Sequence, residues 1–262
     1  ERLFEGDGEI ALLYFFGHGT VTATGGMIVT QDGTTNDEGI SMDDITTLAN
    51  SSGAKNKIII LDCCNSGAAG SPQITGGNLS QLNDGLTVLT ASRNWEQAVE
   101  VSGEGGVFTT LLVEALQGGA ADVRGNITPG SLYAYVDEAL GAWDQRPVFK
   151  TNVSSFARIR QVPPKVSFET LRRIIEYFPV ASDQHQLDPA YEPERSGTEP
   201  DGTPEPDPDK NAIFKDLQKM VAASLVVPVD APHMWHAAME SKSCKLTAMG
   251  HQYWRLASEG KI

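Results

Sequence analysis

Two nearly continuous apolar runs constrain this chain most, because each leads into a side chain that can carry chemistry. The first, EIALLYFF at residues 9–16, leads to His18, and the second, KIIILD at residues 57–62, leads to Cys64. Runs of this length and composition are typical of strands buried on both faces. The sequence therefore predicts two central strands with a His and a Cys just beyond their carboxyl ends.

Predicted strands and helices alternate along the rest of the first 160 residues. A third apolar run, residues 86–91, leads to Ser92, and a hairpin is expected with its turn at Gly25-Gly26. Helices are predicted over residues 41–51, 107–117 and 131–140. This alternation predicts an α/β fold with a mostly parallel sheet flanked by helices. Open sheets of that kind bind ligands at the carboxyl ends of their strands, where the three runs end.

A His and a Cys at one edge of a sheet have a specific chemical use. The thiolate is the reactive form of Cys, and a neutral imidazole with a pKa near 6.5 can take the thiol proton and later return it. We therefore assign Cys64 as a nucleophile and His18 as its general base and acid. The backbone N–H groups of Gly19 and Cys64 are the candidate donors of an oxyanion hole.

A structural interpretation competes for each residue taken alone. A lone buried Cys is more often a small core side chain, and a lone His at a strand end is more often a hydrogen-bonded turn residue. Here His18 lies between two glycines, Cys64 precedes an Asn-Ser-Gly sequence, and both follow consecutive buried strands. The joint pattern favours catalysis.

The motifs YFFGHGT around His18 and IIILDCCNSGAAG around Cys64 resemble the two signatures of caspases, metacaspases and their prokaryotic relatives, the orthocaspases among them. The resemblance covers about residues 5–160. It implies a caspase-type sheet, a Cys-His dyad, an acyl-enzyme intermediate and cysteine endopeptidase activity. Family members carry further strands and helices before the His strand, so the resemblance also implies that this chain is truncated at its N-terminus.

The resemblance decides between the two adjacent cysteines. Aligning DCCNSG with the family's Asp-x-Cys-x-Ser-Gly pattern makes Cys64 the nucleophile, and Cys63 is expected in the core. Asn65 stands where the family often has His or Tyr, a departure that leaves the dyad intact.

The resemblance also suggests which residues form the S1 pocket. Metacaspase-like enzymes that cut after Arg or Lys have an Asp two positions before the nucleophile, here Asp62, and Ser92 and Glu96 are weaker S1 candidates by family position. Asp62 has two equally weighted interpretations. It either pairs with a basic P1 side chain by a charge-assisted hydrogen bond, or it bonds to nearby backbone amides at the strand end.

We expect three parts along the chain. They are a caspase-like peptidase domain at residues 1–164, a helix and acidic Pro-rich linker at residues 165–210, and a small C-terminal domain at residues 211–262. The last part contains LTAMGHQYWRL, with an expected turn at Gly250, and loosely resembles the end of winged-helix domains. That resemblance implies an α+β module for regulation or partner recognition.

Composition narrows the classes of partner. The net charge of −14 argues against a general nucleic-acid surface and suits basic protein or peptide substrates. No apolar run approaches the roughly 18 residues that a membrane span needs. The three cysteines form neither a disulfide framework nor a CxxC pair, which favours a reducing cytoplasm. No strong metal-ligand spacing occurs, so neither a metal nor a cofactor is expected.

Two functions of other classes stay open. In the first, the chain is a catalytically silent caspase-like scaffold, an alternative against which the intact His18 and Cys64 argue. In the second, it is a nucleic-acid or partner sensor with a peptidase as its output. Residues 211–262 hold six Lys or Arg against four Asp or Glu, an excess too small for nucleic-acid binding to lead.

Overall fold

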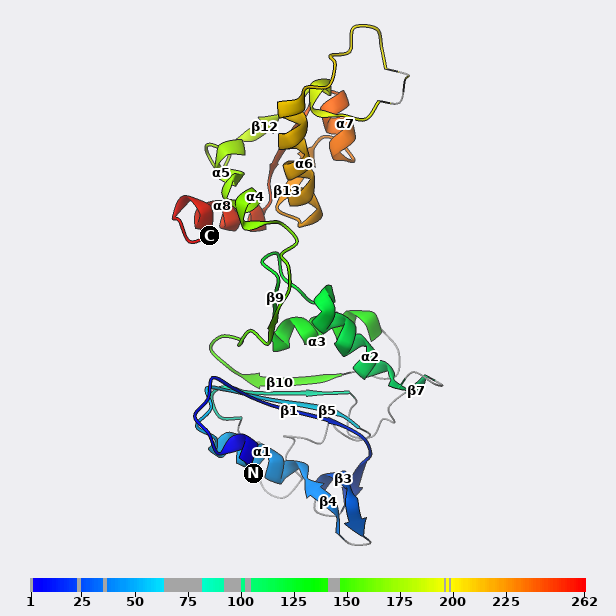
Figure 1. Ribbon diagram of the computed structural model, residues 1–262, viewed down its shortest axis with the longest axis vertical. Helices are drawn as coiled ribbons and strands as arrows, with labels where there is room; N and C mark the ends of the chain where they lie inside the picture. The colour runs from blue at the N-terminus through cyan, green and yellow to red at the C-terminus, as the bar shows by residue number, and fades with distance from the viewer. Residues whose placement is uncertain are drawn as a thin grey trace. The chain divides into compact units, whose positions relative to one another are not determined.

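The computed structural model of the protein divides into two compact units (Figure 1). The first comprises Glu1–Asp122 and Asn126–Val162, and the second comprises Val123–Gly125 and Pro163–Ile262. The structure describes residues 2–22, 25–34, 37–63, 82–91, 100–101, 105–140, 147–195, 197 and 199–262.

A four-stranded sheet forms the centre of the first unit. Its strands, in spatial order, are β1 (Ile10–Phe16), β5 (Asn56–Asp62), β6 (Leu86–Thr90) and β10 (Val148–Asn152). The first three run parallel, and β10 pairs antiparallel with β6. This mixed, mostly parallel sheet confirms the predicted α/β fold, and its parallel strands are the three apolar runs of the sequence.

Helices cover both faces of this sheet (Figure 1). The covering helices are α1 (Met42–Ser51) on one face, and α2 (Val107–Glu114) and α3 (Pro129–Leu140) on the other. Side chains of β5 alternate between these layers: Ile59 and Leu61 join the core cluster on the α1 side, and Ile58 and Ile60 join the cluster beneath α2 and α3. Because both faces are covered, β5 is apolar at successive positions rather than at every second one.

Local signals explain where α1 begins. The Oγ of Ser41 accepts hydrogen bonds from the backbone N–H groups of Asp43 and Asp44, at 3.1 and 3.4 Å. The two carboxylates in the first turn also favour the positive end of the helix dipole.

A second sheet of the first unit contains the predicted hairpin but corrects its turn. Its strands are β2 (Gly19–Thr22), β3 (Gly25–Thr34) and β4 (Asp37–Ser41). Gly25 and Gly26 are not the turn; they begin β3 and pair with Thr22 and Val21. Gly25 has a φ of 135°, a conformation that favours glycine at this strand end and not only in a turn.

Short elements complete the first unit. They are the 3₁₀ turn Arg2–Phe4, β7 (Glu100–Val101), β8 (Gly105–Gly106), a π-helical turn Ala115–Gly119, β9 (Asn126–Ile127) and β11 (Arg160–Gln161). The π-helical turn extends α2 to about the length that the sequence predicts.

The second unit combines an antiparallel sheet with helices. Its strands, in spatial order, are β12 (Gln184–Gln186), β14 (Ser243–Leu246) and β13 (Val226–Val229). Its helices are α4 (Phe168–Arg172), α5 (Ile174–Tyr177), α6 (Pro208–Ala222), α7 (Met234–Met239) and α8 (Ala248–Ser258), with a 3₁₀ turn at Pro189–Tyr191. The winged-helix character of this unit stays a prediction.

Residues 165–210, expected to be a helix and an acidic Pro-rich linker, contribute side chains to the core of the second unit. Leu171, Phe178, Leu187 and Tyr191 are buried in the same core cluster as Phe214. Apolar side chains spaced among the acidic and proline residues therefore supply enough burial to fold the segment with the C-terminal helices. The second unit thus begins near Pro163 rather than at residue 211.

Two smaller expectations also change in the second unit. The helix expected within residues 165–210 is divided, since α4 ends at Arg172 and α5 starts at Ile174. Gly250 is not a turn but lies in the first turns of α8, where a Cβ would come within 2.0 Å of the Leu225 carbonyl oxygen. The glycine therefore permits close approach of α8 to the neighbouring backbone.

Candidate active site

The register of β1 and β5 aligns the two strand ends that the sequence singles out. Phe16 lies opposite Asp62 in the last pair of the ladder, and the Gly17 N–H donates to the Asp62 carbonyl at 3.1 Å. In the sequence, His18 and Cys64 each come two positions after a member of this pair. The described backbone therefore brings side by side the two segments that lead to these residues.

His18 connects the central sheet to the hairpin. Its side chain is exposed, and its carbonyl accepts the N–H of Val29 at 2.9 Å. Gly19 lies opposite Ile28 in the antiparallel ladder, and the bond from Val29 to His18 joins the residues next to them. Gly19 and Ile28 are therefore a pair that exchanges no hydrogen bonds with each other. The N–H of Gly19 therefore points away from β3, on an edge strand of its sheet.

The two adjacent cysteines differ in what the structure describes. Cys63 is 0% exposed and joins the core cluster on the α1 side, which confirms its predicted core position. Cys64, Ser92 and Glu96 lie outside the described residues.

Asp62 ends β5 on the opposite side from Cys63 and is 3% exposed. Its carboxylate Oδ2 accepts the hydroxyl of Thr109 in the first turn of α2. A Cβ on Gly106, the residue before α2, would lie 3.0 Å from that oxygen, so the glycine lets the carboxylate approach the start of the helix. The N-terminal end of a helix favours a negative charge at this place.

Sequence reasoning missed two residues that act on Asp62. Thr109 donates to the carboxylate, and the hydroxyl of Tyr14 lies 2.6 Å from the Thr109 oxygen. Tyr14 is the one polar-tipped residue in the run IALLYFF. Tyr14 pairs with Ile60, which is two positions before Asp62 on β5. Residues two apart on a strand point to the same face, so Tyr14 and Asp62 share a face of the sheet. The alternation along the two strands therefore predicts that Tyr14 and Asp62 lie on one face, but it does not predict Thr109 between them.

Comparison with known proteins decides the family. The family model described as "Caspase domain" matches residues 4–168, more than half of the 262 residues. The chain belongs to the caspase-domain family. This membership supports a function of the cysteine-protease type.

The chain also has a low similarity to a solved structure. Caspase-1 from Spodoptera frugiperda is 13% identical, with a TM-score of 0.41, over 56% of this chain and 62% of that chain. The alignment thus spans less than two thirds of the insect protein. No curated protein sequence matches the chain.

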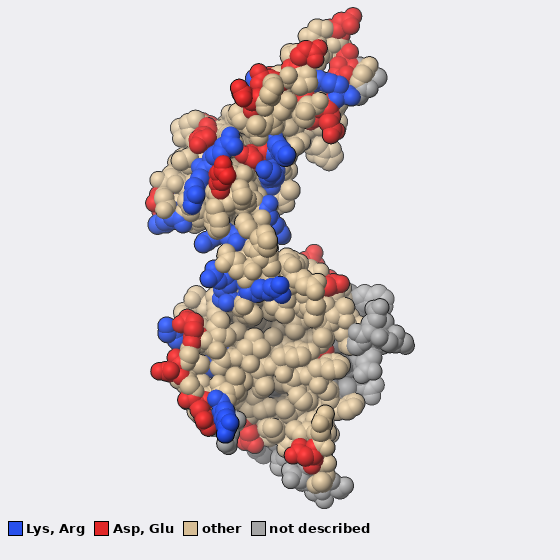
Figure 2. Space-filling model, in the orientation of Figure 1, with Lys and Arg blue, Asp and Glu red and all other residues tan. Residues whose placement is uncertain are grey.

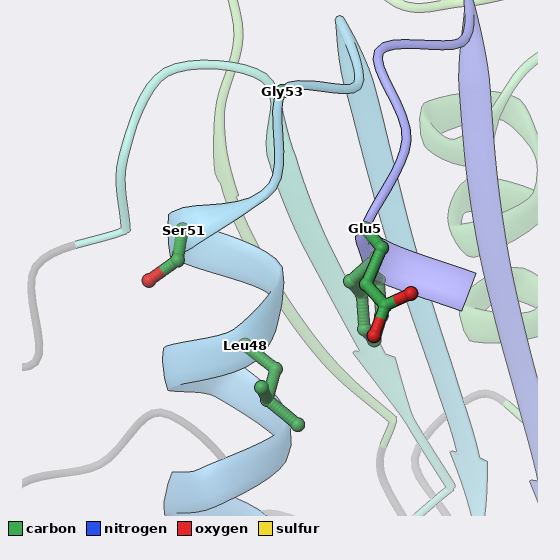
Figure 3. Close-up of a pocket in the computed structure, with 5 residues that line it drawn as sticks. Glu5, Leu48, Ser51 and Gly53 are labelled. Carbon is green, nitrogen blue, oxygen red and sulfur yellow. The ribbon is translucent and has the colours of Figure 1, made fainter. Parts of the chain in front are cut away.

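A pocket of the caspase domain lies at the other end of the sheet (Figure 3). It has a volume of about 300 Å³ and is lined by Phe4, Glu5, Leu48, Ser51 and Gly53. Because Gly53 precedes β5, the pocket is near the amino ends of the strands, away from His18. Nowhere in the described part of the chain do three or more His, Cys, Asp or Glu residues gather as a metal site.

The acidic charge is concentrated in the first unit. That unit holds 8 Lys or Arg against 19 Asp or Glu, and the second holds 12 against 15. On the face shown in Figure 2 the second unit carries side chains of both signs. The small basic excess of residues 211–262 therefore disappears once the whole unit is counted. Of the helices that the structure describes, none is both long and apolar enough to cross a membrane.

Proposed function

We propose that this caspase-domain protein is a cysteine endopeptidase that uses His18 and Cys64 as a catalytic dyad. One observation carries the proposal. Strands β1 and β5 run parallel and in register up to Phe16 and Asp62, and each dyad residue follows two positions later in the sequence. Equal extensions from strands about 4.8 Å apart keep such side chains within reach of each other.

The chemistry follows from the residue types. His18 takes the proton of the Cys64 thiol, and the thiolate attacks the scissile carbonyl carbon. The N–H of Gly19, which points away from β3, and the N–H of Cys64 stabilise the oxyanion that forms. His18 then gives its proton to the leaving amine. Water, deprotonated by His18, hydrolyses the acyl-enzyme and restores the thiol.

We also propose that the enzyme cleaves after Arg or Lys, with Asp62, Ser92 and Glu96 at the S1 pocket. The charge of the first unit supports this specificity, since a surplus of 11 acidic side chains attracts basic segments of a substrate. The buried carboxylate of Asp62 lies two positions before the nucleophile, on the strand that presents it.

Further parts of the proposal concern context. We place the protein among the prokaryotic relatives of caspases, the metacaspases and orthocaspases, and in the cytoplasm. The second unit, which we compare to a winged helix, acts in this proposal as a regulatory or partner-recognition module.

Hydrolysis of fluorogenic peptides with Arg at P1 tests the dyad. His18→Ala and Cys64→Ala should each abolish turnover while circular dichroism and melting temperature stay unchanged, because members of one catalytic unit fail together. Cys63→Ala is the matched control and should retain turnover. Activity that persists in Cys64→Ala, or that vanishes in a folded Cys63→Ala, would contradict the assignment.

A further inference from the structure

The hydroxyl contacts behind Asp62 form a chain with a defined direction. Thr109 has a single hydroxyl hydrogen, and it is donated to the Asp62 carboxylate. The contact of 2.6 Å between Thr109 and Tyr14 must therefore use the hydrogen of Tyr14. The chain runs from Tyr14 through Thr109 to Asp62.

This chain joins three elements of the first unit. Tyr14 belongs to β1, Thr109 to α2 and Asp62 to β5. Exposure falls along it, from 41% at Tyr14, through the half-buried Thr109, to 3% at Asp62. A carboxylate held at one oxygen by a donor on a rigid helix has little freedom to rotate, and the absence of a Cβ at Gly106 keeps the space that this orientation needs.

The chemical nature of the donor matters for recognition. A hydroxyl stabilises an ionised carboxylate by a hydrogen bond but leaves its negative charge in place. Polarisation along two successive hydroxyls strengthens the bond to the carboxylate. The hydrogen bonds from Tyr14 through Thr109 therefore fix the direction of the Asp62 side chain, and neither hydroxyl neutralises its charge.

We propose that Thr109 and Tyr14 are positioning residues for Asp62 and, through it, determine the preference for a basic P1 side chain. This inference rests on the proposed peptidase function. Thr109 holds the carboxylate directly, and Tyr14 holds Thr109 in the rotamer that donates.

Paired substrates separate this role from a merely structural one. The ratio of kcat/KM for a P1 Arg peptide to that for the same peptide with citrulline, a neutral isostere of Arg, should fall about tenfold in Thr109→Val. Thr109→Ser restores the hydroxyl and should keep the ratio within about twofold of wild type. Tyr14→Phe should lower it about threefold, and turnover of the citrulline peptide should stay unchanged in all three variants.

Each failure has its own signature. Wild-type protein that cleaves neither peptide refutes the proposed function. Active wild type whose Arg-to-citrulline ratio is unchanged in Thr109→Val, or a Thr109→Ser variant that behaves like Thr109→Val, refutes the positioning role alone.

A titration tests the chain without any turnover. Burial raises the pKa of Tyr14, and the negative charge of Asp62 adds to the rise. In Asp62→Asn the pKa of Tyr14 should fall, as read from the ring carbon signals of labelled tyrosine with Tyr14→Phe as the assignment control. An unchanged pKa of Tyr14 would overturn the proposed chain.

Discussion

Among the residues that the structure describes, each unit has one buried aspartate, and the surroundings of the two differ in kind. Asp216 in the second unit has a side chain that is 8% exposed and bonds to Arg173 and Lys219, both at 3.0 Å. Asp62 in the first unit is similarly buried but receives the hydroxyl of Thr109 at the end of the strand that leads to the proposed nucleophile.

The comparison separates a carboxylate that holds the fold from one that, in the proposed function, belongs to the substrate site. Two cations compensate the burial of Asp216, and removing Asp216 takes away the partner that they share. The hydroxyl of Thr109 orients Asp62 and, being neutral, does not itself compensate the negative charge of the carboxylate. Burial alone thus does not identify a functional carboxylate, whereas the chemistry of its donors and its place in the sheet help to do so.

The largest effect is expected on the stability of the second unit. Asp216→Ala should lower the free energy of unfolding of this unit by about 3 kcal/mol, because Arg173 and Lys219 lose their shared partner and the buried hydroxyls of Tyr177 and Thr170 lose their acceptor. Urea unfolding followed by tryptophan fluorescence measures this, since Trp254 packs against the core of the unit.

A surface ion pair provides the matched control for Asp216. Glu240 bonds to Lys242 with its side chain 49% exposed, so Glu240→Ala should lower the free energy of unfolding much less than Asp216→Ala does. Equal losses in Asp216→Ala and Glu240→Ala would contradict the structural role of Asp216.

A smaller effect, on selectivity, is expected at Asp62. Asp62→Asn should reduce kcat/KM for P1 Arg peptides about 10- to 100-fold, because a charge-assisted hydrogen bond to the substrate is lost. Unfolding of the second unit should not change. Profiling of cleaved peptide libraries measures the preference, and a wild-type profile dominated by Asp or aliphatic residues at P1 would contradict the specificity.

The smallest effect is the pH dependence that Asp216 confers. Burial by itself would raise the pKa of Asp216, but hydrogen bonds from Lys219 and Tyr177 and the charges of Lys219 and Arg173 prevail and lower it. A lowered folded-state pKa means that Asp216 stabilises the unit fully above its unfolded pKa of about 3.9. This contribution is lost as the pH falls through the folded value.

Urea unfolding between pH 5 and pH 2 tests that sign. The wild type should lose more stability over this range than Asp216→Asn, which has no carboxyl group to protonate at that position. A steeper loss in the variant than in the wild type would contradict the direction of the shift.

Much of the first unit was predictable from its sequence because a strand buried on both faces has a nearly continuous apolar run. The runs that became β1, β5 and β6, and the cap at Ser41, are local signals that tertiary contacts reinforce. The core position of Cys63 follows from alternation along β5. The contact of Thr109 with Asp62 was not predicted, because it joins residues 47 positions apart through the docking of a helix.

The second unit was harder to predict because its composition conceals its core. The acidic and proline residues between 183 and 210 outnumber the apolar ones, yet Leu187 and Tyr191 are buried. An average over the segment predicts disorder, whereas a few well-spaced side chains are enough when helices from later in the chain complete the core. The role of Gly250 was likewise hidden, since close backbone approach leaves no local pattern.

Covalent labelling tests the central claim, that Cys64 is a nucleophile activated by His18, most directly. A peptidyl acyloxymethyl ketone with Arg at P1 should form one adduct, located at Cys64 by peptide mass mapping. The adduct should be lost in His18→Ala and retained in Cys63→Ala. Cys63 and Cys244 serve as internal controls because both are 0% exposed, and burial raises the pKa of the Cys244 thiol to about 12. An adduct on either of them, or labelling of Cys64 that does not depend on His18, would contradict the account.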